Sequence, residues 1–570
     1  MTRRDRLAAT TVALFALAAT ITSLRHDFTF DDVYIVRNNA HVHALGNLWK
    51  LFGQTYWPTQ LGGDGYRPLV MSLFTLQFVA GNGASWVLHL GNIVLAMATA
   101  LAVYWCARAV LPAAGAWVAG ALFAVHPVHV EVTGNIVGQS ELLVALFLSL
   151  AVGHYIRARR RGLLGARDSA IVLALFTCGL LSKEHAIVLP AILVAAELTV
   201  IRDRAWRLAS REARDARVLA LCFALIIAIW FYVRSVVQMN LTGFVPYPVF
   251  LYLKMDVFDR FAMMMTEIPR VAQLLVFPTR LSGDYSPGEV IIPQGFELAE
   301  LPGIFICVGV VALAIALRRR APVASFGLAW VILSYLPVSN LLVATGFITA
   351  ERTLFFPSIG VVLVAGAAFE WFRARERAID RRAAAGVVAA LLLLGVVRSI
   401  DRQRVWKNND VFFDQLVKDE PNGYRAHFLR GRQVGSHTQL RETEMEYKRA
   451  IRLFPYDLSM TLVIASDYHR AGMCEPAVAL LRWSYSVDPS ITDGRYQFVD
   501  CLAKMGLWSE SRDAALEGLR YVGGKQSRGM RRQVASADSA LGRRPWKSQR
   551  ASVSAWQSAR DIAESQHGAR

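Results

Sequence analysis

The chain has 570 residues, of which 54% are hydrophobic and only 19% are charged. A soluble protein of this length would form two or more globular domains and would carry far more charge. The net charge of +18 does not indicate nucleic-acid binding, because the arginines stand in short clusters between hydrophobic runs and no basic stripe is interleaved with aromatic residues.

The hydrophobic runs predict an all-α polytopic membrane bundle of about eleven transmembrane helices. Several of the runs are close to the shortest length that can cross a bilayer, so their limits are soft. The first run has a basic start, and Ala16-Leu17-Ala18 resembles a signal-peptide cleavage site, but its 18 uncharged residues favour an uncleaved anchor. The predicted spans are 7–24, 86–107, 113–131, 141–156, 169–182, 186–201, 218–237, 302–317, 321–340, 353–371 and 383–398.

Arginine clusters predict the topology of these spans. If the spans alternate, every cluster falls on one side of the membrane, which the positive-inside rule identifies as the cytoplasm. The N-terminus is then cytoplasmic and the C-terminal part lies outside. The Ala- and Arg-rich composition is typical of a bacterial protein, so we expect the inner membrane and a periplasmic C-terminal part. The clusters are Arg3, Arg4 and Arg6, then 157–168, 201–217, 318–320 and 372–382.

The region after residue 400 predicts a helical-repeat array. Pro421, Pro455 and Pro489 are spaced by 34 residues, which is the tetratricopeptide period. We expect a membrane domain over 1–400, about three repeats over 401–525, and a terminal helix or flexible tail over 526–570. Such an array is either a structural cap or, as we favour, a dock for a protein or peptide acceptor.

Two cysteines of the repeat region fall at ends of neighbouring repeats that lie on the same side of the stack. Cys474 is at a turn and Cys501 is near the end of the next first helix. A disulfide between them is geometrically feasible in an oxidising compartment.

An acidic pair follows the first span, in the segment DFTFDDVYIVRNN. Asp31 and Asp32 lie a few residues beyond the membrane, among aromatic and β-branched residues. Adjacent carboxylates in such a setting repel each other, which raises one pKa and suits a general base or a metal site. The alternative is a helix cap or a solvated acidic turn.

Further polar residues cluster on the same predicted outer face. The segment HPVHVEVTGNIVGQSELL carries His126, His129, Glu131 and Glu141, whose spacing suits either a metal site or a hydrogen-bonded brace. Lys183–Glu184 and Glu351–Arg352 are either interfacial ion pairs or functional groups, because charges this close to hydrocarbon are costly. Together with Arg67, these cations suit a lipid phosphate as leaving group, and the carboxylates supply a base for a hydroxyl.

Several short motifs, taken as a set, resemble the TMTC proteins, which are transmembrane and tetratricopeptide-repeat-containing O-mannosyltransferases of the GT-C superfamily. The motifs are FDD, YRPL, HPVHVE with GQSELL, SKEH, LSGDYS at 281–286 and ERTLFFPSIG at 351–360, and the resemblance runs from about residue 1 to 520. The array is shorter than in the animal proteins, and Gln139 stands where the family more often has Arg.

The resemblance implies transfer of a sugar, mannose, from a polyprenyl-phosphate donor to a hydroxyl acceptor outside the cytoplasm. It implies a catalytic carboxylate at Asp31 or Asp32 and donor-phosphate binding by Arg67, Lys183 and Arg352. His126, His129, Glu131, Glu141, Glu184 and Glu351 are expected to support the site or the acceptor. A divalent metal is undecided, with Asp32, His129 and Glu131 as its candidate ligands. A non-catalytic scaffold and a transporter of lipid-linked sugars are the alternative functions.

Overall fold

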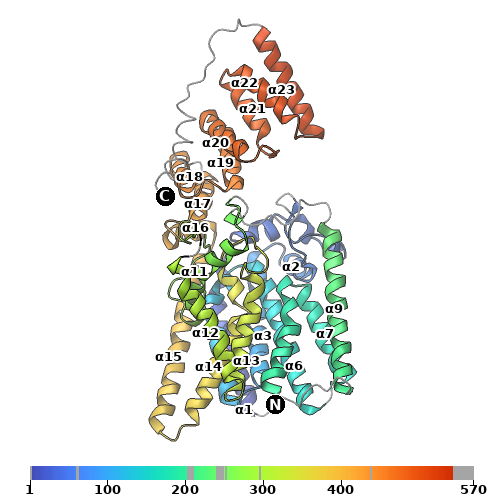
Figure 1. Ribbon diagram of the computed structural model, residues 1–570, viewed down its shortest axis with the longest axis vertical. Coiled ribbons are helices and arrows are strands. Elements are labelled where there is room, and N and C mark those ends of the chain that lie inside the picture. Colours follow the sequence, from blue (N-terminus) through green and yellow to red (C-terminus); the bar gives the residue numbers. More distant parts are fainter. Residues whose placement is uncertain are drawn as a thin grey trace. The chain divides into compact units, whose positions relative to one another are not determined.

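The computed structural model describes residues 3–59, 63–162, 164–201, 211–238, 249–250, 253–293, 295, 297–436 and 439–542. Within these ranges the chain forms helices joined by turns, and the β-bridges there are isolated pairs of residues (Figure 1). The contacts divide the chain into two compact units. Unit 1 comprises Met1–Tyr247 and Met255–Pro421, and unit 2 comprises Pro248–Lys254 and Asn422–Arg570.

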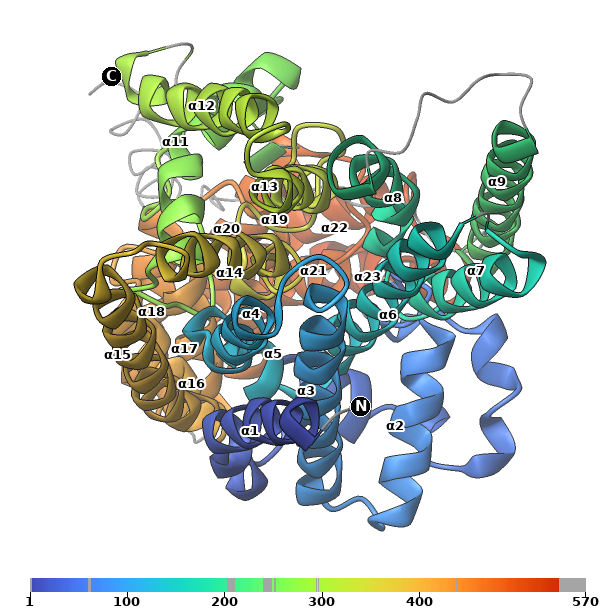
Figure 2. The same ribbon diagram turned by 90° about the horizontal axis from the view of Figure 1, so that it is seen from below.

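Unit 1 is a helical bundle, and its candidate membrane helices differ widely in burial. Of the apolar window in Ile136–Arg161, which contains α6, 78% is buried, whereas the window containing α12 is only 11% buried. Seen end on, α3 and α4 lie between α1, α14 and α6, and α12 lies at the periphery (Figure 2). The helices are α1 (Arg3–Thr20), α2 (Pro68–Ala80), α3 (Ser85–Ala107), α4 (Ala113–Val125), α5 (Val130–Gly134), α6 (Gln139–Arg161), α7 (Ala166–Leu180), α8 (Leu189–Ala196), α9 (Arg211–Gln238), α11 (Val257–Val276), α12 (Leu301–Leu317), α13 (Pro322–Tyr335), α14 (Ser358–Arg373), α15 (Ala378–Gln403) and α16 (Asn409–Asp419).

The described residues contain seven helices that are long and apolar enough to cross a membrane, or eight if the bent pair α4–α5 is one span. The protein is therefore a multi-pass membrane protein. Each predicted apolar stretch overlaps a helix, but some of these helices, such as the 15-residue α7, are too short to qualify alone. The count of eleven spans stays a prediction.

Two helices of unit 1 were not predicted. The 13-residue α2 is apolar but too short to be recognised as a span. The helix α11 is amphipathic, and Glu267, Pro269 and Arg270 interrupt its apolar face. Both lie in segments that the sequence indicated only as connections.

The start of α1 and the end of α6, which carry two of the arginine clusters, lie at the end of unit 1 opposite the acidic loop (Figure 1). Arg108 lies 3.9 Å from Asp5, and the Arg160 guanidinium donates to the carbonyl of Ala109, so the turn after α3 contacts both the start of α1 and the end of α6. At the other end, the Asp27 amide donates to the carbonyl of Lys407 at 2.9 Å, which joins the segment after α1 to the segment after α15. We call this second end the loop end of unit 1.

Unit 2 consists of successive antiparallel helix pairs. Gly431 faces the ring of Tyr447 so closely that a Cβ there would lie 2.7 Å from it, which explains why a small residue is needed at that position. The pairs are α17 (Tyr424–Ser436) with α18 (Leu440–Leu453), α19 (Leu458–Arg470) with α20 (Cys474–Val487), and α21 (Arg495–Lys504) with α22 (Trp508–Gly518), followed by α23 (Gly524–Gly542). Their identification as tetratricopeptide repeats stays a prediction.

Cys474 and Cys501, whose pairing the sequence leaves open, are joined by a disulfide with their Cα atoms 5.0 Å apart. The division between the units falls at Pro421, later than the expected domain limit at residue 400, because α15 continues to Gln403 and α16 belongs to unit 1. Of the expected tail over 526–570, the first part belongs to α23, and 543–570 lie outside the described residues.

Candidate functional site

Three ion pairs lie at the loop end of unit 1, and each joins segments that are far apart in the sequence. Arg67, which precedes Pro68 at the start of α2, donates Nη2 to Glu184 Oε2 at 3.0 Å. The Lys183 ammonium pairs with Glu141 in the first turn of α6. Arg352 Nη1 lies 2.6 Å from Glu131 Oε1, and the Arg352 amide donates to Glu131 Oε2 at 2.7 Å.

These pairings correct one sequence-based reading. Lys183 and Glu184 do not pair with each other, and neither do Glu351 and Arg352. Neighbouring residues in an extended or turn segment point in different directions, so each finds its partner on another element. The resulting links tie α2, α5, α6 and the segments before α8 and α14 together.

The three cations lie within electrostatic reach of one another. Burial lowers the pKa of Lys183 below its ordinary value, and the positive charges of Arg67 and Arg352 lower it further. The negative charge of Glu141 raises it and offsets part of this effect. The carboxylates engage Nε and Nη2 of Arg67 but only Nη1 of Arg352. A guanidinium carries five N–H donors and an ammonium three, so this cluster retains donors for an anionic ligand.

Asp32 is fully buried, and its carboxylate bonds the first loop to the turn before α6. Its Oδ1 accepts from the Val137 amide at 2.9 Å, and its Oδ2 accepts from the amides of Ile136 at 3.1 Å and Thr29 at 3.3 Å. Burial raises the pKa of Asp32 to about 8, although these backbone donors favour the ionised form. With its side chain buried and both oxygens engaged, Asp32 holds the first loop against the turn before α6 and presents no oxygen to a substrate.

Asp31, the neighbour of Asp32, is half-buried. The carboxylates of Glu131 and Asp31 outweigh the effect of burial and keep the pKa of Arg352 above its ordinary value. Both Asp31 and Asp32 act on Tyr56, whose ring lies 4.4 Å from the Arg67 guanidinium. Because both oxygens of Asp32 are bonded to backbone amides, Asp31 is favoured over Asp32 as the carboxylate of the site.

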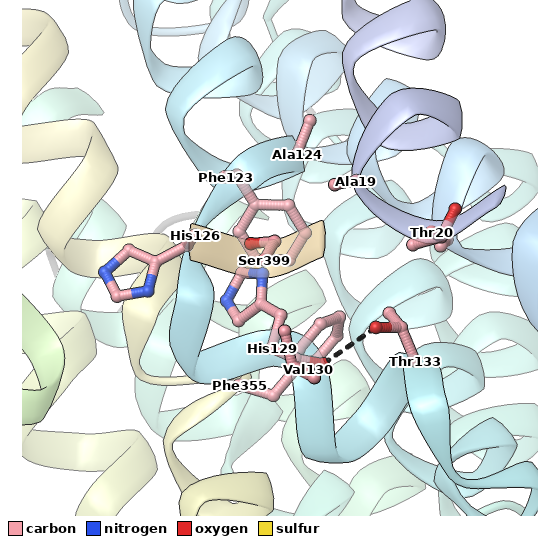
Figure 3. Close-up of a pocket in the computed structure, with 11 residues that line it drawn as sticks. Ala19, Thr20, Phe123, Ala124, His126, His129, Val130, Thr133, Phe355 and Ser399 are labelled. Carbon is pink, nitrogen blue, oxygen red and sulfur yellow. Dashed lines mark hydrogen bonds between the residues drawn. The ribbon is translucent and has the colours of Figure 1, made fainter. Parts of the chain in front are cut away.

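The two histidines of the HPVH segment lie in a separate environment. His129 Nε2 lies 2.8 Å from Ser358 Oγ, and its ring centroid is 4.5 Å from that of Phe123 and 4.4 Å from that of Phe355. His126 Nε2 lies 3.0 Å from the Leu275 carbonyl. Both rings line a small cavity with Thr133 and Ser399 (Figure 3).

The expected metal ligands are not brought together. Over the described part of the chain, no group of three or more His, Cys, Asp or Glu side chains is placed to hold a metal ion. Asp32 is bonded to backbone amides, His129 to Ser358, and Glu131 to Arg352. His126 and His129 each bond to another segment, as the hydrogen-bonded alternative would require.

Glu351 faces away from the cation cluster and anchors the LSGDYS segment. Its Oε1 accepts from the Ser282 amide at 2.6 Å and from the Tyr285 hydroxyl at 2.8 Å. The side chain is buried, and this burial raises the pKa of Glu351 to about 8. Glu351 therefore holds the LSGDYS segment beside the turn that carries Arg352.

Arg234 is a residue of this region that the sequence reading missed. It lies near the end of α9, its Nη2 is 3.8 Å from Asp64 Oδ1, and its charge reaches Glu184. A single arginine inside an apolar run carries a signal, because a cation in a membrane helix is costly unless it has a role. That signal was overlooked because no motif surrounds it.

Comparison with known proteins finds similarity to protein mannosyltransferases. Residues 67–232 match the family described as dolichyl-phosphate-mannose-protein mannosyltransferase. The chain is 25% identical to the protein O-mannosyl-transferase F38B6.6 of Caenorhabditis elegans over 76% of the chain and 61% of the relative. It is 24% identical to human TMTC1 over 76% of the chain and 53% of the relative, and 23% identical to mouse TMTC3 over 83% and 54%.

Among solved structures, the chain resembles the Archaeoglobus fulgidus oligosaccharyltransferase in its apo form, with a TM-score of 0.41, 14% identity, and coverage of 69% of this chain and 56% of that chain. The chain spans between 53% and 61% of the length of the three curated relatives named above. Over most of its length, the chain is similar to protein O-mannosyl-transferases, among them proteins named TMTC1 and TMTC3.

Proposed function

We propose that the protein is a membrane glycosyltransferase of the GT-C type that moves a sugar from a polyprenyl-phosphate donor to a hydroxyl group of a protein or glycan. The observation that carries this proposal is the group of three cations, Arg67, Lys183 and Arg352, each paired with a carboxylate. Asp31 belongs to the same end of unit 1, and its charge acts on Arg352. The description of the matching family and the names of the relatives support mannose as the sugar.

The chemistry requires one base and one site for the leaving group. Asp31 accepts the proton of the acceptor hydroxyl as its oxygen attacks the anomeric carbon, with inversion at that carbon. The bond from the anomeric carbon to the phosphate oxygen breaks, and the lipid phosphate leaves with the electron pair. Arg352, Lys183 and Arg67 stabilise its charge in a partly buried environment, where fixed cations are more effective than in water.

The ion pairs of the site favour this assignment over simple surface salt bridges. Each cation is already held by a carboxylate, so its position is fixed before a ligand binds and little reorganisation accompanies the reaction. Glu131 holds Arg352 through both its side chain and its backbone amide. Glu131, Glu141 and Glu184 are therefore positioning residues for the cations.

The proposed location of the site follows from the distribution of arginines in unit 1. The proposed acceptor follows from the helix pairs of unit 2. If the arginine-rich end of unit 1 faces the cytoplasm of a bacterium, the loop end and its site face the periplasm. The proposed acceptor is a protein or peptide that docks on the helix pairs of unit 2. The described residues assemble no set of metal ligands, so no step of the proposal passes through a metal.

The test is sugar transfer by the purified full-length protein in detergent. It is incubated with polyprenyl-phosphate-mannose and periplasmic extract, and transfer is measured by mass spectrometry. We expect hexose addition with the unaltered protein and its loss in Asp31→Asn at unchanged thermal stability. Equal transfer by Asp31→Asn would overturn the proposal, and absence of transfer by the unaltered protein would support the scaffold alternative. A parallel reaction with EDTA tests dependence on a divalent cation.

A further inference from the structure

The residue immediately before the proposed base has an unusual backbone conformation. Phe30 has φ +55°, in the left-handed region that residues with a side chain rarely adopt. Bulky residues are found there only when the surrounding structure holds them in place. Because Asp31 follows directly, the conformation at Phe30 determines the direction in which its carboxylate points.

The groups that hold Phe30 come from α16, at the end of unit 1. The Phe30 amide donates to Asn409 Oδ1 at 2.7 Å. The Phe30 ring stacks on Phe412 with centroids 5.3 Å apart and meets the edge of Phe413 at 6.0 Å. The segment between α15 and α16 adds a bond from Thr29 Oγ1 to the Trp406 carbonyl at 3.0 Å.

The same helix also reaches the segment beside Arg352. A Cβ added to Gly283 would lie 2.5 Å from Cζ of Phe412, so the two are in close contact. Gly283 follows Ser282, whose amide donates to Glu351, the neighbour of Arg352 in sequence. Phe412 is therefore packed between the loop that carries the base and the loop that supports a cation.

We infer that Asn409 and Phe412 of α16 are positioning residues that hold Phe30 in its left-handed conformation and thereby fix the position of Asp31. These two residues of the segment after the last membrane helix then act on the proposed base through Phe30. Loss of the Asn409 oxygen leaves the Phe30 amide without its acceptor, and the backbone relaxes to a right-handed conformation. This inference rests on the proposed function for its kinetic consequence.

Three variants of adjacent residues test it in the full-length protein. Asn409→Ala removes the acceptor, while Asn409→Asp keeps a side-chain oxygen in reach of the Phe30 amide. Asn408→Ala is the matched control, because Asn408 Oδ1 caps α16 through the Val411 amide at 3.0 Å and does not bond Phe30. The control weakens the helix start without removing the proposed contact.

With polyprenyl-phosphate-mannose as the probe, we expect Asn409→Ala to lower kcat by up to about 10²-fold, since small misplacements of a reacting group have effects of this size. KM for the donor should change little, because the cations are untouched. Asn409→Asp should retain most of the turnover, and Asn408→Ala should retain it as well. Similar kcat values for Asn409→Ala and Asn408→Ala would overturn the inference.

A second measurement does not depend on activity. Hydrogen–deuterium exchange over residues 27–33 should accelerate in Asn409→Ala and not in Asn408→Ala, at melting temperatures that are similar to each other. Unchanged exchange over 27–33 in Asn409→Ala overturns the positioning role. Faster exchange in a protein whose unaltered form transfers no sugar supports the conformational role of Asn409 and counts against the proposed function alone.

Discussion

The Asp32 carboxylate accepts a hydrogen bond from the Val137 amide at 2.9 Å, and this contact separates the roles of two adjacent aspartates. It turns Asp32 into the interior, where two further amides satisfy its other oxygen. Asp31, whose charge acts on Arg352, is left as the candidate base. Of the two adjacent aspartates, Asp32 thus has a structural role, and Asp31 is the candidate for the chemical step.

Asp32→Asn is expected to destabilise unit 1. An asparagine has an N–H₂ group where Asp32 has one of its oxygens. This group cannot accept a hydrogen bond, so at least one backbone amide loses its acceptor. Leaving buried donors unsatisfied costs about 1–3 kcal/mol. Thermal unfolding in detergent should show a lower melting temperature for Asp32→Asn than for Asp31→Asn, which we expect to match the unaltered protein. Equal melting temperatures of the two variants would contradict the structural role of Asp32.

Arg352→Ala is expected to reduce kcat/KM for the lipid-linked donor. Removal of one donor that stabilises a developing negative charge typically costs about 10²–10³-fold. Arg352→Lys should retain part of the activity, because it keeps the charge but loses the forked geometry. Initial rates with polyprenyl-phosphate-mannose measure both effects. Arg404→Ala is the control, since the Arg404 side chain is 78% exposed and its carboxylate partner is also largely exposed.

Arg234→Gln is expected to raise KM for the donor several-fold while kcat changes little. Arg234 contributes positive charge near Arg67 and Glu184, but its only ion-pair partner among the described residues is Asp64, at 3.8 Å and 52% exposed. A long-range charge of this kind contributes to binding more than to the stabilisation of a transition state. Determination of kcat and KM over a range of donor concentrations and at two salt concentrations tests it. A fall in kcat with unchanged KM would contradict this placement.

Glu351→Gln is expected to remove part of the pH dependence of stability. Burial raises the pKa of Glu351 from 4.5 to about 8 in the folded protein. Between these values the folded state retains a proton that the unfolded state has released, so Glu351 makes the protein less stable as the pH rises from about 4.5 to about 8.

Glutamine keeps an oxygen that can accept from Tyr285 and Ser282 and does not ionise. Relative to the unaltered protein, Glu351→Gln should therefore melt at a higher temperature at pH 8 and at a similar temperature at pH 5. Melting curves across this range provide the measurement. A variant that is less stable at pH 8 would show that Glu351 is held as a carboxylate in the folded state.

The sequence by itself determined the helical character of the chain, its division into a membrane part and a repeat-like part, and the ends at which charges gather. Long apolar runs can only be satisfied by helices in a bilayer, and arginine clusters between them mark one side. It also pointed to Arg67, Lys183 and Arg352, because charges next to hydrocarbon stand out locally.

Only the tertiary structure decided which charges pair and which of the two aspartates is bonded to backbone amides. Glu131 and Arg352 are brought together by the packing of α4, α5 and α14, and no sequence spacing encodes such a contact. The roles of Asp31 and Asp32 depend on the turn at Ile136–Gly138 and on the left-handed backbone of Phe30, which α16 holds from far along the chain. Local residue patterns predict the elements, whereas the direction of each side chain follows from contacts between distant segments.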